Sequence, residues 1–441
     1  MARISSPRPS PTQAKVRTDE AYALELDGRD PLRGFRDRFH VPDAAIYLLG
    51  NSLGLMAKES EAAVRRAMGE WRGMAIDGWL HGDPPWFYLA ERVGALAASL
   101  VGAAPEEVVA TGTTTVNIHS LIATFYRPEG KKRKILADEL DFPSDIYALK
   151  GQIELKGFDP GEDLVLVPSR DGRTLDEESI AAMMTDEVAL VFLPSVLYRS
   201  GQLLDIARLT RTAHDKGILI GFDAAHSAGT VPHRFSDWDV DFAVWCGYKY
   251  LNGGPGCCAF LYVNRRHFGR KPFLAGWFGC DKDKQFDMSL EFLPAASAGA
   301  WQISSPSILS TVPLETSLRI IEEAGIERVR DKSLALTAYF MELVDAWLSA
   351  PPYEFRIGTP RDPRRRGGHV ALDRDRHAWE VSQALKERGV IVDYRPPGTI
   401  RLAPAALYNT YLEIRRTAGH IKDIIDRREH LAVSTKKAAI T

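Results

Sequence analysis

A lysine and an aspartate in this sequence each stand at the end of an apolar run, a position that suits chemistry. Asp223 ends the run GILIGF, and Lys249 follows DFAVWCGY, just before the glycine-rich LNGGPG. A lysine carried into a pocket has its charged form destabilised, so its amine becomes available as a nucleophile. A nearby carboxylate can keep a ring nitrogen protonated. Taken singly, each residue has a plainer interpretation: a strand-end turn for Asp223 and a solvent-exposed amine for Lys249.

Together the two residues suit the cofactor pyridoxal 5'-phosphate (PLP). PLP needs a lysine that bonds to it, a carboxylate beside its pyridine nitrogen, an aromatic face and donors for its phosphate. We expect the donors at 113–115, where threonines open the helical pattern VNIHSLIATF, because hydroxyls and free helix N–H groups bind anions. A threonine cluster that only caps a helix is the alternative.

Short β-branched runs alternate with helical patterns between about residues 104 and 265. This alternation predicts an α/β fold, in which helices cover a mostly parallel sheet. Ligands of such sheets bind at the carboxyl ends of the strands, where Asp223 and Lys249 are expected. Beyond this region a long helical stretch and short strands predict a smaller α+β domain. We expect a disordered tail over 1–17, a large domain over 18–305 and a small C-terminal domain over 306–441.

The charge balance and the cysteine content of the chain indicate which kinds of binding partner and which cellular compartment fit it. Lys and Arg total 56 against 58 Asp and Glu, a net charge of -2, which argues against nucleic acid and membrane partners and favours a small-molecule substrate. The four cysteines, at 246, 257, 258 and 280, lack the spacing of a metal site and the density of a disulfide scaffold. The N-terminus has no apolar segment typical of a signal peptide. We therefore expect a cytoplasmic enzyme without a metal.

The chain resembles kynureninase, a PLP enzyme of the fold type I class that splits kynurenine into anthranilate and alanine. The likeness covers about residues 30–425. It rests on GNSLG at 50–54, FPSD at 142–145, DAAHSAGTVPHRFSDWDVDFAVWCGYKYLNGGPG at 223–256, GWFG at 276–279 and IRLAPAALYN at 400–409. The long central string is the most specific of these segments.

The resemblance implies a role for each residue of the expected site. Lys249 bonds to PLP and acts in catalysis with Tyr248 and Asp223. Ser52, Trp79 and Arg401 bind the substrate, with Arg401 on its α-carboxylate, because a guanidinium grips a carboxylate through two hydrogen bonds. The implied cofactor contacts are Thr114, Thr115, Phe142, Ser144, Asp145, Asp223, His226, Tyr248, Lys249, Trp277 and Ser305.

The resemblance also implies the reaction and the assembly. The reaction is the hydrolytic Cβ–Cγ cleavage of L-kynurenine or 3-hydroxy-L-kynurenine to (3-hydroxy)anthranilate and L-alanine, in tryptophan catabolism or NAD biosynthesis. Trp277 is implied to reach the cofactor of the other subunit, so we expect a homodimer with active sites at the subunit interface.

Three positions depart from the family pattern. Cys280, Gln302 and Ser305 stand where a histidine, an arginine and, in animal members, an asparagine are usual. We expect all three on the substrate side, where a lost hydrogen-bond partner changes specificity. Two alternatives therefore stay open: a relative that acts on a substituted kynurenine or another γ-carbonyl amino acid in secondary metabolism, and a PLP-binding protein that has lost catalysis.

Overall fold

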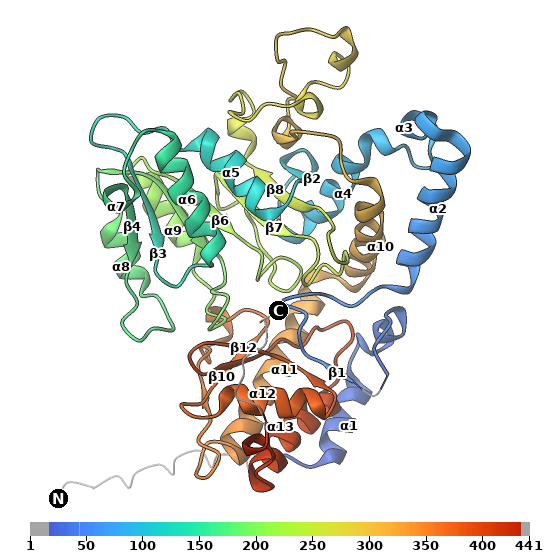
Figure 1. The fold of residues 1–441 in the computed structure, drawn as a ribbon, viewed down its shortest axis with the longest axis vertical. Coiled ribbons are helices and arrows are strands. Elements are labelled where there is room, and N and C mark those ends of the chain that lie inside the picture. Colours follow the sequence, from blue (N-terminus) through green and yellow to red (C-terminus); the bar gives the residue numbers. More distant parts are fainter. Residues whose placement is uncertain (1–16, 44, 434–441) are drawn as a thin grey trace, which may run out of the picture.

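A computed structural model describes residues 17–43 and 45–433, which form two units, each with a sheet and helices (Figure 1). The tail expected over 1–17 lies outside the described residues, except for Arg17. The larger unit contains a seven-stranded sheet of order β2-β8-β7-β6-β5-β3-β4. The strands from β7 to β4 are parallel and β8 is antiparallel to both its neighbours, which confirms the predicted α/β fold with a mostly parallel sheet. The strands are β2 (Val108–Thr111), β3 (Lys134–Asp138), β4 (Leu164–Val167), β5 (Val188–Pro194), β6 (Leu219–Asp223), β7 (Phe242–Cys246) and β8 (Ala259–Val263).

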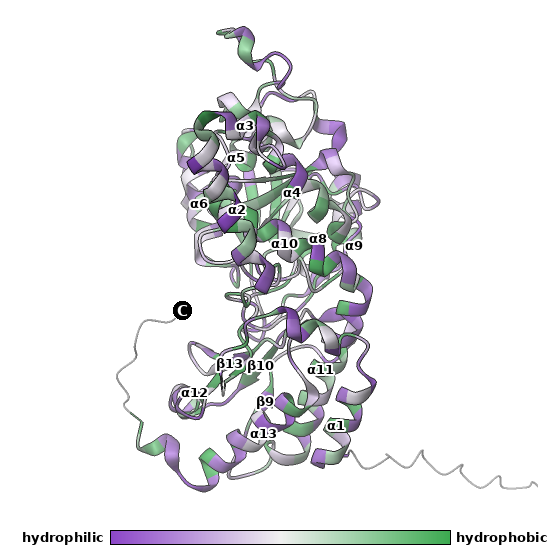
Figure 2. Cartoon of the chain, turned by 90° about the vertical axis from the view of Figure 1, so that its right-hand side faces the viewer, coloured by the Kyte–Doolittle hydropathy of each residue, from purple (hydrophilic) through white to green (hydrophobic). Residues whose placement is uncertain are grey.

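Both faces of this sheet are buried, which is why its strands are nearly continuous apolar runs. In β5, Val191 and Leu193 join one core cluster, whereas Leu190 and Phe192 join another on the opposite face. Figure 2 shows the hydrophobic colour gathered in the strands between the helices. The helices of this unit are α2 (Lys58–Met74), α3 (Gly78–His81), α4 (Leu89–Ala98), α5 (Thr114–Phe125), α6 (Pro143–Leu155), α7 (Pro160–Asp163), α8 (Glu177–Met183), α9 (Ile206–Asp215) and α10 (Ile308–Ala324).

The smaller unit has a four-stranded antiparallel sheet of order β12-β13-β10-β9. Its strands are β9 (Arg356–Ile357), β10 (Val370–Asp373), β12 (Asp393–Arg395) and β13 (Thr399–Leu402), and its helices are α1 (Glu20–Arg29), α11 (Ile326–Trp347), α12 (Ala378–Glu387) and α13 (Tyr411–Asp426). A two-stranded parallel sheet pairs β1 (Ile46–Tyr47) with β11 (Val390–Ile391). None of the helices in the described ranges is long and apolar enough to cross a bilayer.

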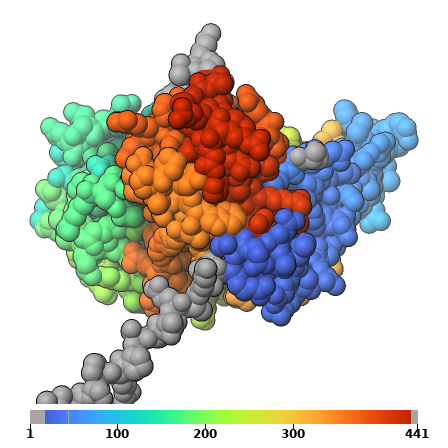
Figure 3. Space-filling model, turned by 90° about the horizontal axis from the view of Figure 1, so that it is seen from below, coloured from blue at the N-terminus to red at the C-terminus, as the bar shows by residue number. Residues whose placement is uncertain are grey.

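Segments far apart in sequence combine to form the smaller unit. Helix α1 packs on α13, and Figure 3 shows the blue N-terminal segment beside the orange and red C-terminal residues. Helix α10 packs instead on α2 and α4 of the larger unit, whereas α11 packs on α13. We therefore propose Gly325, which separates α10 from α11, as the domain boundary in place of residue 306.

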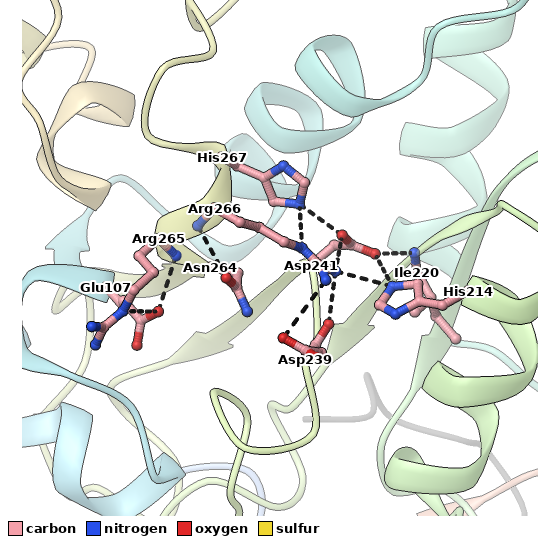
Figure 4. Close-up of polar contacts among 9 residues, drawn as sticks. All are labelled: Glu107, His214, Ile220, Asp239, Asp241, Asn264, Arg265, Arg266 and His267. Carbon is pink, nitrogen blue, oxygen red and sulfur yellow. Dashed lines mark hydrogen bonds and ion pairs between the residues drawn. The ribbon is translucent and has the colours of Figure 1, made fainter.

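The amino end of the parallel sheet is fixed by a fully buried aspartate that precedes β7 (Figure 4). Asp241 accepts hydrogen bonds from the Ile220 backbone N–H (2.8 Å), from Nε2 of His214 (2.9 Å) and His267 (2.7 Å), and from Arg266 (2.5 Å). Burial alone would raise the pKa of Asp241, but these donors hold it well below its usual range. The carboxylate therefore ties β6, β7 and α9 together in its charged form.

Replacing Asp241 with asparagine is expected to lower the free energy of unfolding by about 3 kcal/mol, because Arg266 loses its counter-charge and an amide NH2 replaces one of the buried oxygens that accept hydrogen bonds. The matched control is Asp239→Asn, since Asp239 also pairs with Arg266 but its side chain is 67% exposed; about 0.5 kcal/mol or less is expected there. Urea unfolding at pH 7 measures both. Because the pKa of Asp241 is lower in the folded than in the unfolded protein, its carboxylate stabilises the fold fully at pH values above the unfolded-state pKa of about 4. This stabilisation is lost as the pH falls through the lower pKa of the folded state. The difference between wild type and Asp241→Asn should therefore shrink at acid pH, and equal stability of the two variants at pH 7 would contradict the prediction.

Candidate active site

The predicted lysine lies at the carboxyl edge of the large sheet, beside a buried histidine. Lys249 follows β7, and its Nζ is 3.1 Å from Nε2 of His226, which lies in the turn after β6. Burial first, and then the charge of Lys249, holds the pKa of His226 well below its usual range, so the imidazole is neutral. Its Nδ1 has no hydrogen-bond partner among the described residues. A neutral ring with one free nitrogen can accept from Lys249 and still contact a ligand.

Carboxyl groups face the same edge. Asp223 accepts a hydrogen bond from the Ala225 backbone N–H (2.7 Å) and stays partly accessible to solvent. Burial raises the pKa of Asp145 well above its usual range, and the carboxylates of Asp223 and Asp141 raise it further. The pKa of Asp223 is also raised by burial, but the charge of Lys249 opposes that shift. Asp145 thus holds a proton, and Asp223 is the carboxylate best placed to face a cationic ring nitrogen.

Two helix N-termini lie side by side next to these carboxyls. Helix α5 begins at Thr114 and α6 at Pro143, and Thr115 Oγ1 lies 3.2 Å from Ser144 Oγ. Thr114 Oγ1 is buried without a hydrogen-bond partner among the described residues. Free backbone N–H groups and hydroxyls at two helix starts form a cradle for an anion such as a phosphate.

An aromatic surface and a tyrosine complete this cluster. Phe142, at the start of α6, is exposed and meets Tyr198 edge to face at 5.3 Å, which leaves a ring face available for stacking. The pKa of Tyr248 is raised, first by the Cys246 thiol and then by burial, so its hydroxyl keeps its proton. These groups, with the lysine, the carboxylates and the anion cradle, fit PLP in their charge and in their hydrogen-bonding groups.

The predicted carboxylate-binding arginine enters this cluster from the smaller unit. Arg401 in β13 is only 1% exposed and donates to Asp393 from Nε (2.8 Å) and from Nη2. It also donates to the Tyr198 carbonyl of the larger unit (2.6 Å) and, more weakly, to Ser52 Oγ (3.4 Å). Ser52 can lie here because the neighbouring loop passes close to Lys249: a Cβ on Gly54 would be 2.5 Å from the Lys249 carbonyl oxygen.

Sequence reasoning missed a second histidine and the partners of the arginine. His369 precedes β10, is fully buried, and lies 5.8 Å from His226 between ring centroids. Burial first, and then the charge of Arg401, lowers its pKa to about 3. The segment GGHVALD gives a weak signal for a strand start but none for a contact with His226. Asp393 and Tyr198 carry no local signal at all.

The predicted residues Trp79, Trp277 and Ser305 form a separate apolar cluster. They line a cavity of about 430 Å³ together with Phe87, Phe278 and Phe286, and no residue of the Lys249 cluster lines it. Trp277 is 50% exposed and meets Phe286 edge to face at 5.6 Å. This cavity lies beside the loop over 270–301, part of which projects from the larger unit in Figure 1. A single chain therefore holds the predicted site residues in two places.

Gln302, expected on the substrate side, is placed next to the apolar cavity but is not part of its lining. Gln302 is fully buried and donates from Nε2 to Glu91 (2.7 Å), which also pairs with Lys282 (2.7 Å). Gln302 therefore fastens the segment that follows the projecting loop to α4, which is a structural role. Of the three departures from the family pattern, only Ser305 lines the apolar cavity, because Cys280 lies outside its lining.

Comparisons with known proteins agree along nearly the whole chain. A family profile described as the kynureninase C-terminal domain matches residues 329–421. Kynureninase from Geobacillus thermodenitrificans is 55% identical over 419 residues, which are 95% of this chain and 97% of that protein. Kynureninase from Bacillus cereus is 54% identical over 419 residues, which are also 95% of this chain and 97% of that protein.

Solved structures of lower identity support the fold alone. A cysteine desulfurase from Thermococcus onnurineus superposes with a TM-score of 0.77 at 20% identity, covering 90% of this chain and 99% of that one. A cysteine desulfurase from Escherichia coli gives a TM-score of 0.72 at 20% identity, covering 91% of this chain and 98% of that one.

Proposed function

Because the chain belongs to the kynureninase family, we propose that it catalyses the PLP-dependent hydrolysis of L-kynurenine or 3-hydroxy-L-kynurenine to anthranilate or 3-hydroxyanthranilate and L-alanine. The observation that carries this proposal is the cluster in which Lys249 and Asp223, from the ends of β7 and β6, come together with Arg401 from β13 of the smaller unit. No comparison favours the secondary-metabolism alternative or a protein that has lost catalysis.

The residues of the Lys249 cluster would hold PLP. Lys249 Nζ would bond to it, Asp223 would face its pyridine nitrogen, and the ring of Phe142 would stack on it. The anion cradle of Thr114, Thr115 and Ser144 would take its phosphate, with Asp145, His226 and Tyr248 completing the pocket. When bound, PLP withdraws electrons from the substrate's α-carbon, which lets bonds at the α- and β-carbons break.

The chain's own residues then bind the substrate and move protons. The Arg401 guanidinium holds the α-carboxylate and so orients the amino acid toward Lys249. The Lys249 amine would accept the α-proton and could return it later in the cycle. Water adds to the γ-carbonyl, and the Cβ–Cγ bond breaks to release the aryl acid. The Tyr248 hydroxyl, which keeps its proton, would supply a proton as alanine forms.

The second cluster is best explained by a homodimer with shared active sites. None of the residues that line the apolar cavity of Trp79, Trp277 and Ser305 belongs to the Lys249 cluster, and most of its lining side chains are apolar, as an aryl ring requires. Large apolar side chains are exposed around that cavity, including Ile76, Leu80 and Phe286. Exposed apolar surface of this kind marks an interaction site. We infer that each subunit supplies Trp79, Trp277 and Ser305 to the site of its partner.

The cellular setting follows from the same proposal. The cysteines of the described chain are free thiols, which suits a reducing cytoplasm. The reaction would place the enzyme in tryptophan catabolism, and its 3-hydroxy branch would supply NAD biosynthesis.

A direct assay tests the function. Purified protein supplied with PLP is expected to convert L-kynurenine, its 3-hydroxy derivative or both into the aryl acid and L-alanine in equal amounts, followed by fluorescence and amino-acid analysis. The ratio of kcat/KM for the two substrates would assign the preference. Formation of neither aryl acid would refute the proposal, provided that the protein binds PLP.

A further inference from the structure

The arginine proposed to take the substrate carboxylate already carries a carboxylate partner. Asp393 faces Arg401 across the β12–β13 register and accepts from both Nε and Nη2. The Asp393 side chain is almost as buried as Arg401. An isolated Arg–Asp pair has no net charge, so it would attract a second carboxylate only weakly.

A second guanidinium changes this charge balance. Arg395 lies two residues beyond Asp393 on β12, on the same face of the strand, and donates from Nη2 to Asp393 Oδ2 (2.9 Å). Arg395 is itself largely buried. One buried carboxylate thus lies between two guanidinium groups, and the group of three carries a net charge of +1.

The directions of the hydrogen bonds show how Arg401 is oriented. A guanidinium has five N–H donors. Asp393 occupies Nε and one N–H of Nη2, and the Tyr198 carbonyl occupies one N–H of Nη1. Within the described parts of the chain, one N–H of Nη1 has no acceptor, and the remaining N–H of Nη2 makes only the long contact with Ser52 Oγ at 3.4 Å. Arg401 is therefore anchored by one edge and keeps donors for a further acceptor.

We propose that Asp393 and Arg395 are positioning residues for the carboxylate of an α-amino acid ligand: Asp393 fixes the guanidinium plane of Arg401, and Arg395 offsets the charge of Asp393. This inference rests on the proposed function, because it concerns the carboxylate of that substrate and of its alanine product. It predicts that the net charge of these three groups, rather than Arg395 as such, sets the affinity for the carboxylate.

The test measures how three variants bind two ligands, of which one has a carboxylate and the other does not. The variants are Arg395→Gln, the double variant Asp393→Asn with Arg395→Gln, and the control Arg356→Gln, which breaks a half-exposed ion pair with Asp375 in the same unit. The dissociation constants of L-alanine and L-alaninamide are measured from the absorbance change of the PLP-loaded protein. Steady-state kcat and KM for L-kynurenine are measured in parallel.

Arg395→Gln is expected to raise the dissociation constant of L-alanine about tenfold, because the site loses one positive charge at close range. L-Alaninamide binding and kcat should stay within about twofold, while KM rises with the alanine dissociation constant. The double variant restores the net charge of +1, and the amide oxygen that Asp393→Asn introduces can still accept from Arg401, so alanine affinity should recover most of the loss. The control should bind alanine as the wild type does.

Three results would overturn the inference: equal alanine affinity in Arg395→Gln and the wild type, equal losses for alanine and alaninamide, or no recovery in the double variant. Because alanine binding is measured without turnover, these results are separable from failure of the proposed function. If kynurenine is not hydrolysed but the alanine series behaves as expected, the charge arrangement stands and the reaction assignment falls.

Discussion

Replacing Lys249 with alanine is expected to abolish both the visible absorption of the PLP-loaded protein and its turnover of kynurenine. The lysine is the only proposed covalent attachment for the cofactor and also the proposed acceptor of the α-proton. Losing both roles should lower kcat at least about ten-thousand-fold. Absorbance spectra and a fluorescence assay for the aryl acid measure the two effects.

The control for this substitution is Lys216→Ala, since the Lys216 side chain lies on the surface and donates to the Ala181 carbonyl. It should keep the spectrum and turnover of the wild type. Far-UV circular dichroism of Lys249→Ala checks that the fold is retained. A folded Lys249→Ala protein with substantial turnover would show that another group is the nucleophile.

Mixed dimers of two inactive variants are expected to recover activity if each subunit completes the site of its partner. Lys249→Ala damages the Lys249 cluster, and Ser305→Trp fills the apolar cavity that Ser305 lines. In a mixed dimer both lesions fall in one site and the other site is intact. Random pairing of equal amounts should therefore give about a quarter of wild-type activity from parents that have almost none.

The matched control pairs Lys249→Ala with Arg401→Met, because both lesions fall in the Lys249 cluster and every site of a mixed dimer is then damaged. Differently tagged subunits allow the mixed dimers to be purified and assayed. Absence of recovery in purified Lys249→Ala/Ser305→Trp dimers, or recovery in the control, would refute shared sites. A protein that light scattering shows to be monomeric while active would refute the dimer itself.

The α/β fold and the cluster around Lys249 were predictable because their signals are local. Parallel strands buried on both faces are continuous apolar runs, and the first polar residue after such a run lies at the edge of the sheet. Asp223 ends β6 and Lys249 follows the neighbouring strand β7. The threonines at the start of α5 were predictable for the same reason, since a helix start has a local pattern.

Long-range packing decided the rest, and short segments of sequence carry little trace of it. Helix α1 joins the C-terminal unit and α10 the larger one, so the expected boundary at residue 306 does not follow the packing. Gln302 is a substitution at a family position, but only its burial beside Glu91 reveals its structural role.

The chain's local patterns thus specify which groups can do chemistry, because residue type and strand-end position are properties of short segments. The orientation of those groups is a property of the folded whole. The Tyr198 carbonyl, Asp393 and Ser52 approach Arg401 from three separate segments, and a backbone carbonyl looks the same in every residue. Such contacts are set by how the two units pack, and only the tertiary structure defines them.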